Sequence, residues 1–196
     1  LSVFVVASCG LAYELIAGAL SSYLIGASVT QFSTVIGTYL FAMGVGSYLS
    51  RFVLNNVAAR FIQIELLVGL LGGYSAVALF WVYAFLSAPF KVVLYGLVML
   101  TGTLVGLEIP LVMRLLEKQI QFRELVSQVL SFDYLGALLV SLLFPLVLAP
   151  QLGMVRSALL FGLLNAVVAL WALWLFRQQL PELRALLLQS GVVIVL

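Results

Sequence analysis

The stretch Gly102-Thr-Leu-Val-Gly-Leu-Glu-Ile-Pro-Leu-Val-Met-Arg114 lies late in a long apolar run of the chain. Its glutamate, Glu108, would cost roughly 3 kcal/mol at the centre of a bilayer, so it needs a protein or water partner rather than lipid. Pro110 removes a backbone donor just after it, and the spacing of Gly102 and Gly106 lets another helix come close. The stretch therefore predicts the inward-facing part of a helix bundle in a membrane.

The composition of the 196-residue chain also indicates a membrane protein. Hydrophobic residues make up 65% of it and charged residues 8%, and its mean hydropathy is +1.27. A soluble domain of this length needs a wettable exterior, which so few polar residues cannot provide. The absence of histidine and the single cysteine, Cys9, exclude an internal disulfide and the common imidazole-ligated haem, zinc or copper sites. We therefore expect a lipid bilayer around the chain, no metal and no nucleic-acid partner.

Seven hydrophobic segments, each near the roughly 20 residues that a spanning helix requires, can be marked along the chain. They predict an all-α fold, a polytopic transmembrane domain over residues 1–196 with six complete helices and a partial seventh. The chain begins without Met and stops within an apolar run, so we expect it to be part of a longer polypeptide. The segments cover about residues 2–24, 32–54, 61–86, 92–113, 126–148, 157–176 and 185–196.

The distribution of basic residues predicts an orientation in the membrane. Seven of them follow the second, fourth and sixth segments, and two follow the third and fifth. Because cytoplasmic loops carry the excess of Lys and Arg, the first set and the N-terminus should be cytoplasmic, and the seventh segment should leave the cytoplasm. The seven are Arg51, Arg60, Arg114, Lys118, Arg123, Arg177 and Arg184, against Lys91 and Arg156.

Four carboxylates within or near the hydrophobic segments are the candidate site residues. Glu14 and Glu108 lie deep in their segments, whereas Glu65 and Asp133 lie about one turn from predicted cytoplasmic ends. Converging carboxylates could form a proton relay or bind a cationic ligand such as an amine. For Glu65 and Asp133 the simpler interpretation is an interfacial ion pair, and for the other two both interpretations stay open. The basic partners would be Arg51, Arg60, Arg114 or Arg123.

Small residues accompany the carboxylates of two segments. Gly10 and Gly18 flank Glu14 at a spacing of four, and Gly69 follows Glu65 at the same spacing, so each set shares a helix face. The GxxxG spacings at 69–73 and 102–106 predict helix packing rather than chemistry. The sequence shows no nucleotide-binding glycine loop, metal-ligand cluster or catalytic triad, and no catalytic residue is assigned.

Several stretches of the chain together resemble one known family. They cover most of the chain in order and include Cys9-Gly-Leu-Ala-Tyr-Glu-Leu-Ile-Ala-Gly18, the opening stretch to Pro110, and Leu130-Ser-Phe-Asp-Tyr-Leu-Gly-Ala137. The others are Gln31-Phe-Ser-Thr-Val-Ile-Gly37, Ala42-Met-Gly-Val-Gly-Ser-Tyr-Leu-Ser50, Ile64-Glu-Leu-Leu-Val-Gly69 and Phe161-Gly-Leu-Leu-Asn165. In this combination the chain resembles the membrane domain of the integral-membrane spermidine synthases, or polyamine aminopropyltransferases.

The resemblance implies that a soluble Rossmann-like domain follows the membrane helices in a bacterial cytoplasmic membrane. That domain would transfer an aminopropyl group from decarboxylated S-adenosylmethionine to putrescine. The family's catalytic residues belong to it, and this sequence has no positions that match them. A seventh helix that leaves the cytoplasm fits poorly with a cytosolic catalytic domain, so the charge pattern and the resemblance disagree at this point.

Three functional hypotheses follow from the sequence. In the first, the chain is the membrane domain of a spermidine-synthase-like protein, anchoring its soluble domain and offering carboxylates to a polyamine. In the second, it is a transporter-like bundle for a cationic solute built around Glu14 and Glu108. In the third, it is a structural subunit of a larger membrane complex, and its carboxylates only pair with basic residues.

Overall fold

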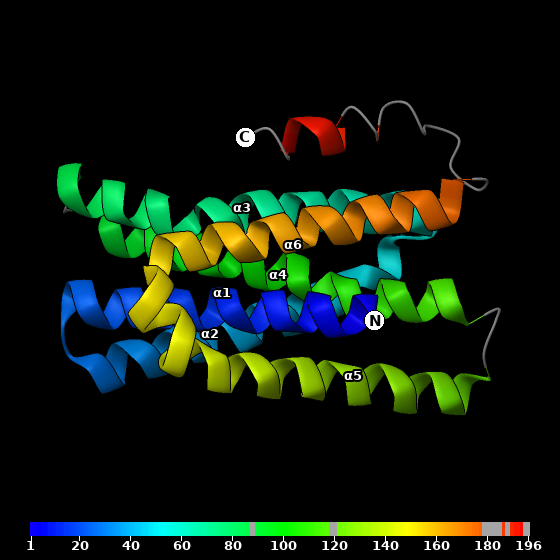
Figure 1. Cartoon of the computed structure of the whole chain (residues 1–196), viewed down its shortest axis with the longest axis horizontal. Coiled ribbons are helices and arrows are strands. Elements are labelled where there is room, and N and C mark those ends of the chain that lie inside the picture. Colours follow the sequence, from blue (N-terminus) through cyan, green and yellow to red (C-terminus); the bar gives the residue numbers. More distant parts are fainter. Residues whose placement is uncertain (87–88, 118–120, 178–185, 187–188, 194–196) are drawn as a thin grey trace.

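The structure of the chain is a computed structural model that describes residues 1–86, 89–117, 121–177, 186 and 189–193. Six α-helices in this part run up and down along one axis (Figure 1), which confirms the predicted all-α bundle. Of the predicted partial seventh helix, 185–196, the structure describes residues 186 and 189–193, which are helical, and the other half lies outside the described residues. The helices are α1 (Ser2–Ile25), α2 (Ser28–Leu49), α3 (Val57–Phe85), α4 (Phe90–Leu116), α5 (Phe122–Leu143) and α6 (Gly153–Phe176).

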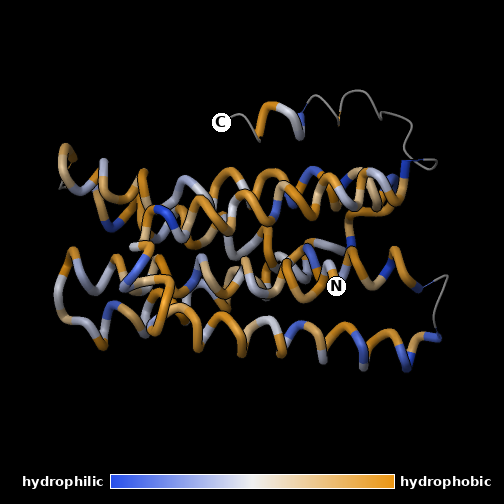
Figure 2. The backbone as a smooth tube through the Cα atoms, in the orientation of Figure 1, coloured by the Kyte–Doolittle hydropathy of each residue, from blue (hydrophilic) through white to orange (hydrophobic). Residues whose placement is uncertain are grey.

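Within the described residues, five helical stretches are long and apolar enough to cross a membrane. The first four correspond to α1 to α4, and the fifth runs without a break from Phe122 to Phe176. Figure 1 shows that this fifth stretch folds back on itself, so α5 and α6 run in opposite directions. Apolar residues dominate the helices along their length, as Figure 2 shows. The chain is therefore an integral membrane protein domain.

The fold-back between α5 and α6 is a π-helical segment, η2 (Phe144–Leu152), which carries Pro145 and Pro150. Proline removes backbone donors, so the chain here cannot keep a regular α-helical ladder. Gly153 follows with φ +75°, a left-handed conformation that glycine adopts without a side-chain penalty. The fifth predicted segment ends at residue 148 and the sixth begins at residue 157, so a loop was expected between them. The chain instead turns within a helical segment.

Three helices begin about one turn earlier than the hydropathy indicates. α2 begins at Ser28, α3 at Val57 and α5 at Phe122, whereas the apolar segments begin near residues 32, 61 and 126. Hydropathy marks where the chain becomes apolar enough for lipid, and a first helical turn in the interfacial region can stay polar. The shift matters because it places residues near these ends deeper in their helices.

Two pairs of helices pack backbone to backbone through glycine. In the α2–α4 pair, a Cβ on Gly106 would lie 2.6 Å from Met43 Cα. In the α3–α6 pair, a Cβ on Gly162 would lie 2.7 Å from the Gly69 carbonyl oxygen and 3.0 Å from Gly73 Cα. The predicted packing role of both GxxxG spacings is therefore confirmed, because small residues are what permits such close approach.

Helix α1 lies between these two pairs and contacts all five other α-helices. It is also the most buried membrane-crossing helix, with 61% of its apolar window inside the protein. Helix α5 packs mainly on α1 and lightly on α4, so it forms the outer edge of the bundle on that side (Figure 1). Helix α1 is thus the centre of the bundle, and the stretch Gly102–Arg114 of α4 packs around it.

Candidate functional site

Three of the four candidate carboxylates line one cavity of about 180 Å³ between α1, α2, α4 and α5. Glu14 comes from α1, Glu108 from α4 and Asp133 from α5, and two tyrosines, Tyr39 and Tyr134, complete the polar part of its wall. None of the described residues that line it is basic. We call this cavity the carboxylate pocket.

The pocket is positioned by close contacts along one face of α1. The Tyr39 hydroxyl donates a hydrogen bond of 2.8 Å to the Gly10 carbonyl oxygen, one turn before Glu14. A Cβ on Gly10 would lie 2.8 Å from Val105 Cγ1, so α4 is also held against α1 here. Helix α5 also packs closely on α1, because a Cβ on Gly136 would lie 2.5 Å from the Phe4 carbonyl oxygen. These contacts fix three walls of the pocket around the carboxylates.

The three carboxylates of the pocket differ in the exposed fraction of their side chains. Glu108 is 1% exposed and Glu14 is 6% exposed, whereas Asp133 is half-buried. Glu108 lies within electrostatic range of Asp133 on one side and of Glu65 on the other. Among the described residues, no group of three or more His, Cys, Asp or Glu is arranged to hold a metal ion. The pocket therefore presents separated acidic positions rather than a metal-type cluster.

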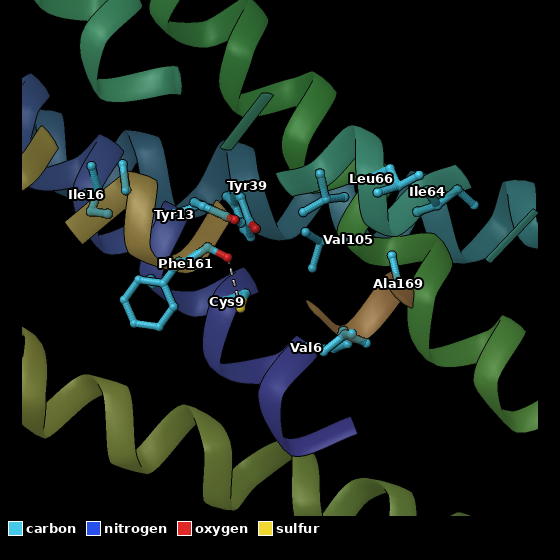
Figure 3. Close-up of a cluster of buried hydrophobic side chains, with 14 of the residues drawn as sticks. Val6, Cys9, Tyr13, Ile16, Tyr39, Ile64, Leu66, Val105, Phe161 and Ala169 are labelled. Carbon is cyan, nitrogen blue, oxygen red and sulfur yellow. Dashed lines mark hydrogen bonds between the residues drawn. The ribbon is translucent and has the colours of Figure 1, made fainter. Parts of the chain in front are cut away.

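The fourth candidate, Glu65, lies on the other side of α1 and does not line the pocket. It is fully buried, and neither of its carboxyl oxygens has a hydrogen-bond partner in the described part of the protein. The Tyr13 hydroxyl and the Asn165 amide are buried without partners in the same way. Figure 3 shows Tyr13 and Tyr39 with their hydroxyl ends directed to the same region, beside Cys9 and Val105.

The predicted interfacial ion pair is wrong for Glu65. Its carboxyl oxygens have no partner in the described residues, and two of the four arginines proposed for it donate to other acceptors. Arg114 Nη1 donates to the carbonyl oxygens of Ser50 at 2.8 Å and Val53 at 3.0 Å. Arg60 Nη1 donates to Gln63 Oε1 at 3.1 Å.

Depth in the helix explains the error. Glu65 lies eight residues after the first residue of α3, about two turns inside rather than one. Asp133 lies eleven residues after the first residue of α5, and the pocket places it beside the other acidic side chains rather than beside a basic one. Another arginine near this end, Arg51, stacks over the Tyr48 ring at 3.8 Å. An early helix start thus turns a predicted interfacial group into an interior one.

The sequence analysis did not single out Tyr39 and Asn165 as polar groups of the interior. A signal for Asn165 was present, because it lies among Gly162, Ala166 and Ala169 in α6, the same small-residue setting that marks Glu14 and Glu65. Tyr39 carried no comparable signal, since its role depends on the carbonyl of another helix.

Apolar helices that cross a membrane around buried carboxylates define the class of this protein, a polytopic membrane domain with an acidic interior. The chain is homologous over nearly its whole length to the N-terminal part of polyamine aminopropyltransferases, which confirms the family that the sequence resembles.

Three relatives illustrate the homology. The chain is 65% identical over 182 residues to polyamine aminopropyltransferase 2 of Ralstonia nicotianae, covering 92% of this chain and 36% of the relative. It is 50% identical over 196 residues to polyamine aminopropyltransferase of Leptospira interrogans, covering 100% and 39%. It is 40% identical over 202 residues to polyamine aminopropyltransferase 1 of Streptomyces coelicolor, covering 100% and 37%.

The chain thus spans a little over a third of the length of these curated relatives. No family model matches it. No solved structure matches it either.

Proposed function

We propose that this chain is the membrane domain of a polyamine aminopropyltransferase-like protein, which anchors a soluble transferase domain and binds a cationic amine in the carboxylate pocket. The observation that carries the proposal is the homology over nearly the whole chain to one part of proteins with that name, together with the pocket of Glu14, Glu108 and Asp133. The relatives extend well beyond the matched part. Decarboxylated S-adenosylmethionine would bind in that further part, outside this chain.

The proposed orientation places the N-terminus and the end of α6 in the cytoplasm of a bacterial cell. Both lie toward one end of the bundle in Figure 1, with the end of α4 and the beginnings of α3 and α5. Of the described basic side chains, five belong to this end and two, Lys91 and Arg156, to the other. An excess of Lys and Arg favours the cytoplasmic side. The five are Arg51, Arg60, Arg114, Arg123 and Arg177.

The pocket favours a small amine with more than one ammonium group. Its acidic positions come from three helices, lack a basic partner in the pocket wall, and do not form a cluster for one metal ion. Intramembrane carboxylates of this kind mark sites for ions or charged ligands. A volume of about 180 Å³ is below the roughly 300–1,000 Å³ of sites for drug-sized ligands, so the ligand should be slender.

The proposal is tested by amine binding to the full-length protein in lipid nanodiscs. Spermidine and putrescine binding is measured by calorimetry for wild type, Glu14→Gln and Asp133→Asn. A hydrogen bond to a charged group contributes about 1.5–3 kcal/mol, so each variant should weaken the pocket site by about 10- to 100-fold. Glu117→Gln is the matched control, because Glu117 is exposed at the end of α4 and outside the pocket. Unchanged affinity and site number in both pocket variants would contradict amine binding.

A transporter for a cationic solute is the second candidate. One observation favours it: Glu108 lines the pocket with Asp133, and its Oε1, like both carboxyl oxygens of Glu65, is buried without a partner among the described residues, so buried acidic groups extend beyond the pocket. Spermidine flux into proteoliposomes that depends on Glu108 would support transport. Binding without flux in wild type would leave the anchor and amine site as the function.

A further inference from the structure

A second group of polar side chains is sealed inside the bundle on the side of α1 that faces α3 and α6. It consists of Tyr13, Glu65, Glu108 and Asn165, which we call the core cluster. The atoms without access to solvent and without a hydrogen-bond partner among the described residues are Tyr13 Oη, both Glu65 carboxyl oxygens, Glu108 Oε1, and the amide Oδ1 and Nδ2 of Asn165. The four residues come from four different helices.

Glycines of α3 bring the members of the core cluster together. Gly69 and Gly72 lie four and seven residues after Glu65, so all three share one face of α3. The Tyr13 ring occupies the space where Gly72 has no side chain, because a Cβ there would lie 2.5 Å from Tyr13 Cζ. Asn165 lies opposite Gly69, with 3.2 Å between its Cβ and a Cβ built on that glycine. Tyr13 is within electrostatic range of both Glu65 and Glu108.

The cluster cannot be explained as ordinary packing. Each buried polar group without a partner costs about 1–3 kcal/mol, and an ionised carboxylate costs far more unless it is paired. Of the four arginines proposed as partners from the sequence, Arg114 and Arg60 donate to other acceptors. Neither carboxyl oxygen of Glu65 has a hydrogen-bond partner among the described residues. The negative charge therefore has to be neutralised by something that is not a side chain of the described bundle.

We propose that the core cluster binds a small monovalent cation, either a sodium ion or a proton, at a second site that shares only Glu108 with the carboxylate pocket. Glu65 supplies the charge, and oxygens of Tyr13, Asn165 and Glu108 supply further donors. Hard cations take oxygen ligands, which are what this cluster offers. The site does not depend on amine binding, so it goes beyond the proposed function.

Glu108 belongs to both the core cluster and the carboxylate pocket. A cation at the core cluster repels a second cation in the pocket and competes with it for the Glu108 carboxylate. By reciprocity, an amine in the pocket weakens binding at the core cluster by the same factor. The two sites are thus coupled through one side chain.

The test measures the thermal stability of the full-length protein in detergent, in sodium chloride and in choline chloride at equal ionic strength, from pH 6 to 9. A bound sodium ion should raise Tm by about 5–10 °C at saturation relative to choline, most strongly at high pH, where protons compete least. If the cation is a proton, Tm falls as pH rises and does so equally in both salts. Other titratable groups near the cluster are Cys9, Tyr39, Glu14 and Asp133.

Two variants assign the response to the core cluster. Glu65→Gln should abolish the sodium or pH response, and Asn165→Ala should weaken it in a protein that keeps its carboxylates. Glu14→Gln, in the pocket only, should keep the response. A wild-type Tm that is independent of salt and pH, or a response that survives in both cluster variants, overturns the proposal. Amine affinity measured in parallel tells whether the pocket functions regardless of that result.

Discussion

Carboxylates on the two sides of α1 lie in different environments. On the α2–α4–α5 side, Glu14 and Asp133 line a cavity, whereas on the α3–α6 side Glu65 is sealed. The neighbouring helices account for this difference. Helix α6 packs against α3 backbone to backbone at Gly162. Helix α5 packs on α1 and makes few contacts with α4. A glutamate within a stripe of small residues thus predicts an interior position for the carboxylate. Whether that carboxylate lines a cavity or is fully buried depends on how closely the neighbouring helices pack.

The largest expected effect comes from separating α2 and α4, the two helices that pack backbone to backbone beside the pocket. Gly106→Val should destabilise the bundle by about 3 kcal/mol or more, because its side chain would collide with the Met43 backbone. The measurement is thermal unfolding in detergent. Gly96→Val is the control on the same helix, since nothing lies within 4 Å of a Cβ at Gly96. Equal effects of the two would mean that α2 and α4 are not in backbone contact.

The sealed side is expected to gain stability when its charge is removed. Replacing a buried ionisable group by an apolar one of similar volume is often stabilising, so Glu65→Met should raise the unfolding free energy by about 2 kcal/mol in choline chloride. The same substitution at Glu14 should give a smaller gain, because that carboxylate lines the pocket. Denaturation in both variants measures the difference. A larger gain at Glu14 would reverse the assignment of sealed and reachable sides.

A smaller effect is expected where a single hydrogen bond joins α2 to α1 on the pocket side. Tyr39→Phe removes the donor to the Gly10 carbonyl and should cost about 1 kcal/mol. Tyr134→Phe, also in the pocket wall but 68% exposed, should cost less. Both are measured by thermal unfolding. No loss in Tyr39→Phe would show that this bond does not hold α2 to α1.

The smallest change should follow at the outer edge of the pocket. Asp133→Asn keeps the shape of the side chain at a half-buried position, so stability should change by less than about 0.5 kcal/mol. Its effect on amine affinity should be far larger. If stability instead falls as much as in Tyr39→Phe, Asp133 has a structural partner and the pocket is not free for a ligand.

Much of the fold was predictable from the chain itself. Segments of spanning length predict the helices, and the spacings Gly102–Gly106 and Gly69–Gly73 predict close helix contacts. Their partners were not predictable, because apolar side chains face lipid and protein alike and hydropathy does not distinguish the two. For the same reason the central role of α1 was missed: its burial is a property of five neighbours and not of its own composition.

The candidate site was predictable in its members and only partly in its geometry. The cost of a carboxylate in an apolar segment identified Glu14 and Glu108, which line the same cavity. The depth of Glu65 and Asp133 was underestimated, because their helices begin a turn before the apolar segments. Whether a carboxylate finds an arginine depends on where that arginine's other acceptors lie. For Arg114 these are the carbonyls that end α2 and follow it.

The central place of α1 has a consequence for how the protein is made. Its thiol, on Cys9, meets the Phe161 carbonyl across 152 residues of chain. At roughly 5–20 residues per second, the ribosome delivers that partner about 8–30 s after it has made Cys9. Helix α1 therefore waits for α6, one of the helices that enclose it, and Glu14 meanwhile stays in the bilayer or its insertion machinery. Helices α2 and α4 are made earlier than α6 and can pair before α1 is fully enclosed.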